Sequence, residues 1–538
     1  MTATPAPGPD AAIAVGGHPR RWWILPVLCL SLFLVVVDNT IVNVALPTLS
    51  RELSASTSQL QWIVDAYSLV FAGLLLAFGS FGDRYGRKGV LQIGLVVFAA
   101  TSVAAALTTS AAQLIAARAA MGVGAALVFP ATLAILTNVF TDPVERAKAI
   151  GVWSAVSGLA VALGPLSGGW LLEHFAWGSI FLVNVPVVAV ALVAGHQLIP
   201  KTRDPDAGRL DPNGLLLSIA AILLLVYTVI EAPKHGWGHP LTIGGFAAAA
   251  LLVVGFVAWE LRRDHPMLDV RVFRNARFSA ASGAVACAFF GLFGFIFLMT
   301  QYFQVVRGYS TLSAGLHTLP FAVASATAAP IAARLALRIG TKLVVAGGLT
   351  LMTAGFVWLS FLEADTPYWG PVVVQAAMIG AGLTLTLAPA TEAILGSLPK
   401  EKAGVGSAVN DTTRELGGTI GVAVIGSVFA SLYGPEIVRR LQGLPIPARA
   451  VAAAEESVVA AAEVARQAPP GGRAIVLEAA VDAFMRGFST GVLVAAGVTA
   501  TAAVAALAFL PARAVHPEHP DHPDVPAEPD AGAPATIA

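Results

Sequence analysis

Six ionisable side chains lie inside apolar runs that are long enough to cross a lipid bilayer. They are Asp38, Asp65, Arg118, Asp411, Arg414 and Glu415. An ionised group in hydrocarbon is costly unless it is paired or hydrated, and such residues mark ion and substrate pathways. A chain that retains six of them is expected to move something charged.

Three of these residues share a depth in the outer half of the bilayer. Asp38 lies nine residues before Pro47, about 13 Å from the outer end of its helix at 1.5 Å per residue. If their helices are neighbours, the three can form a mutually neutralising cluster, in which we predict that Arg118 pairs with Asp38 and Asp65 lies nearer the lumen. Burial favours the neutral acid and arginine favours the charged one, so separation from Arg118 would let an acid bind a proton. The alternative is a static pair that only packs helices.

The other three residues share one helix, at positions i, i+3 and i+4. This spacing lets Arg414 neutralise Asp411 along the helix. Glu415 lies about 18 Å from the cytoplasmic end, close to the middle of the bilayer. It would then remain available for a substrate or a proton. The alternative is a self-satisfied trio that anchors the helix.

The elements that position these residues are apolar helices. The chain is 56% hydrophobic and 12% charged, with a mean hydropathy of +0.76, whereas soluble domains carry about 25% charged residues. Fourteen apolar spans between Trp22 and Leu510 predict an all-α membrane protein. Lysine and arginine gather in the loops on the side of the N-terminus, which predicts that both termini are cytoplasmic.

One short loop is repeated in the second half of the chain. The segment Gly79-Ser-Phe-Gly-Asp-Arg-Tyr-Gly-Arg-Lys88 has its arginine, glycine and lysine matched in Ala333-Arg-Leu-Ala-Leu-Arg-Ile-Gly-Thr-Lys342, 254 residues later. Two halves built on one plan around a central site are typical of secondary transporters.

The first of these loops resembles the signature of the major facilitator superfamily. Further motifs are Asp38-Asn-Thr-Ile-Val-Asn43, Arg118-Ala-Ala-Met-Gly-Val-Gly124, Gly164-Pro-Leu-Ser-Gly-Gly169 and Asn410-Asp-Thr-Thr-Arg-Glu-Leu-Gly-Gly418. Together they are similar to the fourteen-span drug:proton antiporters of EmrB/QacA type, in the form found in actinobacteria. The resemblance covers roughly Arg20 to Arg513.

The resemblance implies an all-α major facilitator fold with two pseudo-symmetric six-helix bundles and two extra central helices, fourteen transmembrane helices in all. The expected parts are a disordered cytoplasmic N-terminus (1–21), an N-terminal bundle (22–200), two linker helices with flanking loops (201–277), a C-terminal bundle (278–510) and a disordered cytoplasmic tail (511–538). The C-terminal bundle includes an extracellular helical hairpin at 434–485.

The resemblance also implies roles for two of the motifs. A cytoplasmic gate, latched when the protein faces outward, would be formed by Gly79, Asp83, Arg84, Gly86, Arg87 and Lys88. The antiporter motif would be formed by Gly164, Pro165, Gly168 and Gly169, whose small residues allow close helix packing. The alternative is that the cations of this loop only set the orientation of the chain in the membrane.

We expect the substrate cavity to include Asn39, Asn43, Trp62 and Tyr67, because the last two flank Asp65 and offer aromatic faces to a flat cation. The expected function is proton-coupled multidrug efflux by alternating access, with export of amphipathic, cationic drugs or antibiotics. An exporter of an endogenous metabolite, lipid or self-made antibiotic is the alternative, followed by a proton-coupled uptake symporter.

An enzyme is not expected, because neither a Ser-His-Asp arrangement nor a metal-ligand spacing occurs. No metal, cofactor or ATP is expected either, since the chain lacks the Gly-Lys pair of a phosphate loop and the proton gradient would drive transport. Zero net charge gives no reason to expect nucleic-acid binding. The expected partners are a small-molecule substrate, protons and the lipid bilayer, for a monomer in a bacterial plasma membrane.

Overall fold

The computed structural model describes residues 18–202, 211–263, 266, 268, 270–397, 403–444, 446–468 and 470–511. The expected terminal segments, apart from residues 18–21 and 511, lie outside these ranges. In the described ranges every regular element is a helix. Twelve helical stretches there are long and apolar enough to cross a membrane. The chain is therefore an all-helical membrane protein.

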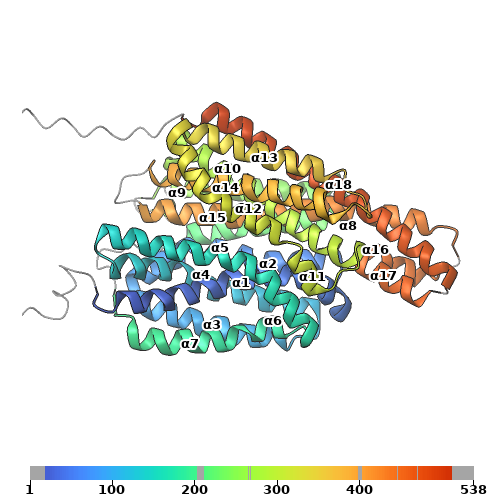
Figure 1. The fold of residues 1–538 in the computed structure, drawn as a ribbon, viewed down its shortest axis with the longest axis horizontal. Helices are drawn as coiled ribbons and strands as arrows, with labels where there is room; N and C mark the ends of the chain where they lie inside the picture. Colours follow the sequence, from blue (N-terminus) through green and yellow to red (C-terminus); the bar gives the residue numbers. More distant parts are fainter. Residues whose placement is uncertain are drawn as a thin grey trace, which may run out of the picture.

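The first half of the chain forms one bundle. Its helices are α1 (Arg21–Leu53), α2 (Thr57–Tyr85), α3 (Arg87–Ala106), α4 (Ala111–Val139), α5 (Pro143–His174), α6 (Ser179–Leu182) and α7 (Asn184–Leu198). α4 packs between α2 and α3, and α1 packs between α5 and α7. The bundle is drawn in blue to green in Figure 1.

The second half forms another bundle beside the first (Figure 1). Its elements are η2 (Val270–Arg274), α10 (Ala276–Gln301), η3 (Tyr302–Val306), α11 (Thr311–Leu316), α12 (Leu319–Ile339), α13 (Thr341–Leu359), η4 (Tyr368–Val372), α14 (Val373–Leu395), α15 (Ala403–Leu441), α16 (Ala448–Glu456), α17 (Val458–Gln467) and α18 (Pro470–Phe509). α14 packs on α12 and α13, and α10 packs on α15 and α18.

Two helices follow the first bundle in the sequence and precede the second. They are α8 (Pro212–His235) and α9 (Pro240–Glu260), and they pack on each other. α8 also contacts α2 of the first bundle and α15 of the second. Ser427 on α15 donates a hydrogen bond of 2.7 Å to the Val229 carbonyl. α8 therefore lies across the seam where α2 and α15 meet.

The repeated loop takes the same form in both bundles. Gly86 joins α2 to α3 with φ +114°, and Gly340 joins α12 to α13 with φ +88°. Glycine enters this left-handed region without the steric penalty of a side chain. The structure thus confirms the duplication that the sequence predicted at these turns.

The segment 434–485, predicted as a short helical hairpin, is helical on both sides of the break near Pro470. α15 continues unbroken to Leu441 and α18 begins at Pro470, so much of the segment extends two long helices. Between them lie α16 and α17, which we call the cap. The Ala-rich stretch is broken at Ser457, because that residue has an extended backbone and its side chain caps α17.

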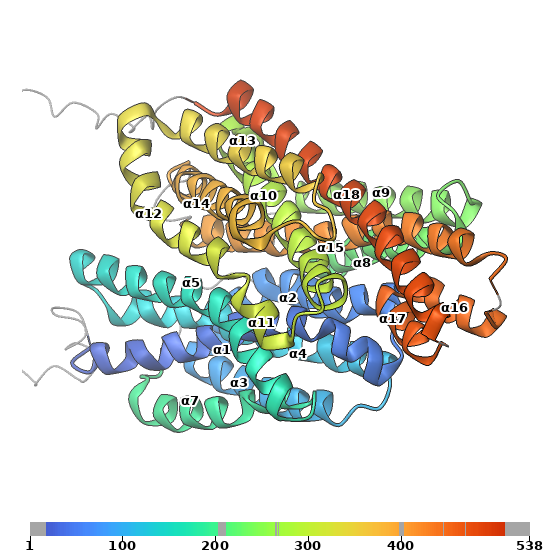
Figure 2. The ribbon, with the colours of Figure 1, turned by 45° about the vertical axis from the view of Figure 1, so that its right-hand side comes forward.

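The two bundles touch at the end of the molecule that carries the cap. Thr311 on α11 donates a hydrogen bond of 3.1 Å to the Gly169 carbonyl on α5, and Leu312 N donates one of 3.1 Å to Glu173. Gln61 on α2 donates to the Ala423 carbonyl on α15 at 3.0 Å. Away from the cap, α5 and α12 diverge toward the opposite end (Figure 2). The molecule is therefore closed at the cap end.

Glycines let α5 approach α1 closely. A Cβ atom at Gly168 would lie 2.6 Å from Ile41 Cγ1 and 2.8 Å from Val44 Cγ1. Gly164 faces Thr40 on the same side of α5. Helices in lipid have no hydrophobic driving force for association. Small residues at such interfaces stabilise the contact through close van der Waals packing.

We predict that Gly168→Leu lowers the free energy of unfolding by about 1–3 kcal/mol, the usual effect of overpacking. Thermal unfolding in detergent measures the change. Gly151→Leu on the same helix is the control, since a Cβ atom there meets nothing within 4 Å. Equal melting temperatures for the two variants would contradict the close packing of α1 and α5.

Candidate functional site

A fully buried ion pair lies at the centre of the first bundle. Arg118 on α4 contacts Asp38 on α1 with Nη1 and Oδ2 2.6 Å apart, and both side chains are 0% exposed. The predicted pairing is confirmed. Neither helix could hold its charged residue in hydrocarbon without the other, because a lone buried charge is strongly destabilising.

Groups from two further helices also contact this pair. Asn184, the first residue of α7, donates from Nδ2 to Asp38 Oδ1 at 2.8 Å, and Arg118 Nε donates to the Ile63 carbonyl on α2 at 3.1 Å. The Arg118 guanidinium lies 4.2 Å from the centre of the Tyr67 ring. Four helices of the first bundle therefore meet at one charge pair.

Sequence reasoning missed Asn184. The signal was present, because Asn184 is the only polar residue in the run from Ile180 to Ala194. A polar side chain inside a transmembrane segment usually hydrogen-bonds to another helix.

Asp65 does not join the pair, so the predicted three-residue cluster was wrong. Its side chain is fully buried, and neither carboxylate oxygen has a hydrogen-bond partner among the described residues. The physical reason is the face of α2 from which the Asp65 side chain projects. Gln61, one turn earlier on the same face of α2, donates to α15, whereas the Ile63 carbonyl accepts from Arg118.

The three charged residues of α15 lie together as predicted. Arg414 Nη1 is 3.8 Å from Asp411 Oδ1, and Arg414 Nη2 donates to Thr391 Oγ1 on α14 at 3.1 Å. Glu415 faces the Asn39 side chain of α1. Its Oε2 atom is buried without a hydrogen-bond partner among the described residues.

Asn39 brings the two bundles together at this point. It follows Asp38 directly in α1, and its Oδ1 accepts a hydrogen bond of 3.5 Å from Ser68 on α2. Asn43, one turn later, donates to the Asn39 carbonyl at 3.2 Å, while its Oδ1 is buried without a partner in the described part of the chain. Asn39 thus follows Asp38 directly in the chain and faces Glu415 of the other bundle.

Of the two aromatic residues predicted in the cavity, Tyr67 is fully buried and Trp62 is partly buried. Tyr67 is fully buried under Arg118 and donates to the Val35 carbonyl at 3.2 Å. Trp62 packs against Tyr227 of α8, with ring centres 6.3 Å apart. The linker helix, whose position the sequence did not reveal, covers the face of α2 that carries Trp62.

The gate loop contacts its own bundle in this structure. Arg87 N donates to the Thr202 carbonyl at 3.0 Å, and Lys88 Nζ donates to the His196 carbonyl at 2.7 Å. Arg84 stacks over the neighbouring Tyr85 ring at 5.7 Å. The Asp83 side chain lies outside the described part of the structure, and the Cβ atom that Gly79 lacks would point at Pro130 on α4.

The antiporter motif uses two faces of α5. Gly164 and Gly168 face α1, while Gly169 and the Pro165 carbonyl face α11 of the other bundle. A Cβ atom at Gly169 would lie 2.6 Å from Leu312 Cα. The motif is therefore placed at the contact that closes the cap end.

The sequence matches the model of one known protein family over most of its length. Residues 28–422 match the model of the Major Facilitator Superfamily. The chain belongs to that superfamily. Superfamily members are membrane transporters rather than enzymes, so the buried charges lie in a transporter that acts on small molecules.

Similar proteins from several bacteria share most of the chain. The multidrug efflux pump LfrA of Mycolicibacterium smegmatis is 37% identical over 487 residues, which cover 89% of this chain and 94% of LfrA. The methyl viologen resistance protein SmvA of Salmonella typhimurium is 38% identical, covering 87% of this chain and 93% of SmvA. The tetracenomycin C resistance and export protein of Streptomyces glaucescens is 33% identical, covering 90% and 91%.

Solved structures support the superfamily fold. A bacterial homolog of the human lysosomal transporter Spinster, crystallised inward-facing and unoccupied, aligns with a TM-score of 0.64 at 20% identity. The alignment covers 92% of this chain and 99% of the homolog.

We predict strong coupling between Asp38 and Arg118. Asp38→Asn and Arg118→Gln should each lower stability by about 3–5 kcal/mol, because each leaves one charge buried alone. The double variant should recover a large part of the loss. Melting temperatures of the four proteins in detergent give the coupling energy, and additive effects would contradict a mutually dependent pair.

We predict the opposite behaviour for Asp65. Asp65→Leu should raise the free energy of unfolding by about 1–3 kcal/mol, since it removes an unsatisfied buried polar group. Asp38→Leu is the matched comparison and should lower it. If both leucine variants destabilise alike, Asp65 has a partner that the geometry does not show.

Proposed function

We propose that the protein is a proton-driven exporter of amphipathic, cationic drugs or antibiotics. The relatives named above, at 33–38% identity, are named for multidrug efflux, methyl viologen resistance and antibiotic export. Methyl viologen is a flat dication, and buried acids are suited to such a molecule. A self-made antibiotic is the second candidate, favoured by the Streptomyces relative, whose name combines resistance with export.

The observation that supports this proposal most directly is the burial of Asp65. A fully buried carboxyl group with no hydrogen-bond partner among the described residues fits its surroundings as the neutral acid, because an isolated ionised carboxylate is very costly in hydrocarbon. We propose that Asp65 takes up a proton from the cap side when α2 and α15 part and water enters. It then carries this proton as the neutral acid into the closed-cap conformation, in which the bundles touch at the cap end, and releases it toward the opposite side when a cationic drug binds at the seam. Asp38, already paired with Arg118, keeps the bundle rigid and couples its helices.

The substrate site in this proposal lies between the bundles, beside Asn39 and Glu415. Glu415 supplies a carboxyl group, and Phe289 supplies a ring, with the Arg414 guanidinium 5.8 Å from its centre. A cationic drug that displaces Arg414 from Phe289 would gain both the ring and an acid. Proton and drug would then compete for negative charge at the same seam.

We infer a fourteen-span topology with both ends of the chain in the cytoplasm. α2 and α5, with 29 and 32 residues, are long enough to add two spans to the twelve. The cationic loops support an extracellular cap, and in this proposal the closed end is extracellular and this conformation faces inward. In the outward-facing state the gate loop, Gly79 to Lys88, would latch the cytoplasmic side. A monomer in the bacterial plasma membrane, without ATP or other cofactor, completes the proposal.

Transport in proteoliposomes tests the proposal. With an imposed pH gradient, wild type should move methyl viologen against its concentration, while Asp65→Asn and Glu415→Gln should lose the gradient-driven part. Asp38→Asn should lose transport together with stability. Glu463→Gln, on the exposed surface of α17, is the control and should transport like wild type.

Each alternative has its own outcome in this assay. Retention of gradient-driven transport by all three neutral variants would overturn the assignment of these acids. Uptake driven in the direction of the proton flow would indicate a symporter. Transport of the antibiotic made by the host, with none of methyl viologen, would favour the second candidate.

A further inference from the structure

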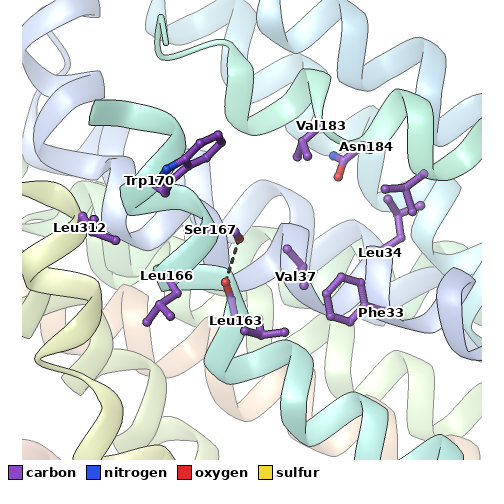
Figure 3. A pocket seen from close by; sticks show the side chains of 11 residues that line it. Phe33, Leu34, Val37, Leu163, Leu166, Ser167, Trp170, Val183, Asn184 and Leu312 are labelled. Atoms are coloured by element: carbon purple, nitrogen blue, oxygen red, sulfur yellow. Dashed lines mark hydrogen bonds between the residues drawn. The ribbon is translucent and has the colours of Figure 1, made fainter. Parts of the chain in front are cut away.

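A lateral pocket of about 450 Å³ lies in the first bundle, away from the seam that holds Glu415. α1 forms its floor, α5 and α7 form its walls, and Leu312 of α11 closes one end (Figure 3). Its lining includes Leu34 and Val37 on α1, Leu163 and Trp170 on α5 and Val187 on α7. α5 and α7 both pack on α1 and leave this slot between them.

The pocket offers almost no polar surface to an occupant. Apart from the indole N–H of Trp170 at the exposed edge, Ser167 and Asn184 carry the polar side-chain groups among its lining residues. The Ser167 hydroxyl donates to the Leu163 carbonyl at 2.8 Å, and the Asn184 amide donates to Asp38 and to Ser102. With these donors already engaged, a hydrocarbon is the chemistry that fits.

The mouth of the pocket belongs to the lipid-facing surface. Trp170 is 48% exposed, and Val190 and Val193, farther along α7, are 59% and 61% exposed. Apolar side chains exposed on a membrane-crossing bundle face acyl chains. The surrounding bilayer therefore supplies hydrocarbon directly to the pocket.

We propose that the pocket holds one acyl chain of a bilayer phospholipid and that this chain favours the closed-cap conformation. The volume also falls within the ~300–1,000 Å³ of sites for drug-sized molecules. A lipid tail is favoured because the bilayer presents it at far higher concentration. The gain comes from van der Waals contact with side chains that otherwise border a void, since the tail leaves an equally apolar medium.

The pocket spans the contact that closes the cap end. Leu312 belongs to the second bundle, whereas the floor and both walls belong to the first. When α11 leaves α5, the pocket loses that end and an occupant loses those contacts. A ligand that binds one conformation better shifts the population toward it. The occupant also packs beside Asn184, which holds the Asp38 carboxylate.

This proposal goes beyond transport, because it depends on neither the exported molecule nor the proton. Photolabelling in nanodiscs tests it directly. The probe is a phosphatidylethanolamine with a diazirine in the middle of one acyl chain, and the readout is mass-spectrometric mapping of labelled peptides. Wild type should be labelled on the stretch from Leu163 to Trp170.

Variants that fill the pocket should lose this label. Val187→Trp should lower labelling of the α5 wall about tenfold, as expected for 1.4 kcal/mol of lost affinity. Leu163→Trp, from the opposite wall, should do the same if Val187→Trp fails to fold. Val190→Trp is the matched control on the same helix, outside the pocket lining, and should label like wild type.

Equal labelling of wild type and both filled variants would overturn the site. Labelling by a photoreactive drug analogue, with no labelling by the lipid, would assign the pocket to a soluble ligand and overturn the proposed occupant.

The conformational effect has a separate measurement. Spin labels on Phe175, just after α5, and Leu316 of α11, which are 56% and 45% exposed, report the separation of the two bundles at the cap end after replacement of Cys29 and Cys287. In the same nanodiscs, Val187→Trp should alter the ratio of short to long distances relative to Val190→Trp, since a fixed side chain of one bundle replaces a tail that contacts both. An unchanged ratio would overturn the coupling of the pocket to the closed state.

Discussion

The pairing of Asp38 with Arg118 is the constraint on which the first bundle depends. Each charge would be intolerable in hydrocarbon without the other, so α1 and α4 are bound to one relative position. Asn184 and the Ile63 carbonyl extend the constraint to α7 and α2. The bundle can then rotate as a rigid body, because the interaction that holds it lies within it and not across the seam.

The acids at the seam follow a different rule. Among the described residues, Asp65 and Glu415 each have a buried carboxylate oxygen without a hydrogen-bond partner, and they lie on α2 and α15, the helices that meet there. Their surroundings must change when those helices separate. The paired acid, Asp38, lies inside one bundle and has a structural role. The acids at the seam, Asp65 and Glu415, lie where the surroundings depend on the conformation.

The sequence predicted the parts of this arrangement that depend on depth and local spacing. The depth of Asp38 and Arg118, together with the helix neighbours that the family resemblance implies, predicted their pairing, and the loop repeat predicted matching turns at Gly86 and Gly340. The isolation of Asp65 could not be predicted, because it depends on which face of α2 turns toward α15. Trp62 is covered by α8, and no periodicity in the chain reveals where a linker helix docks.

The position of α8 has a consequence for molecules dissolved in the bilayer. Ile219 of α8 packs on Gly73 of α2, and Val229 accepts a hydrogen bond from Ser427 of α15, so one helix is attached to both rocking bodies. That flank is shielded from sideways entry by hydrophobic compounds, and each turnover must slide α8 against at least one neighbour. The linker pair therefore makes the two flanks of the transporter different for molecules that approach within the plane of the membrane.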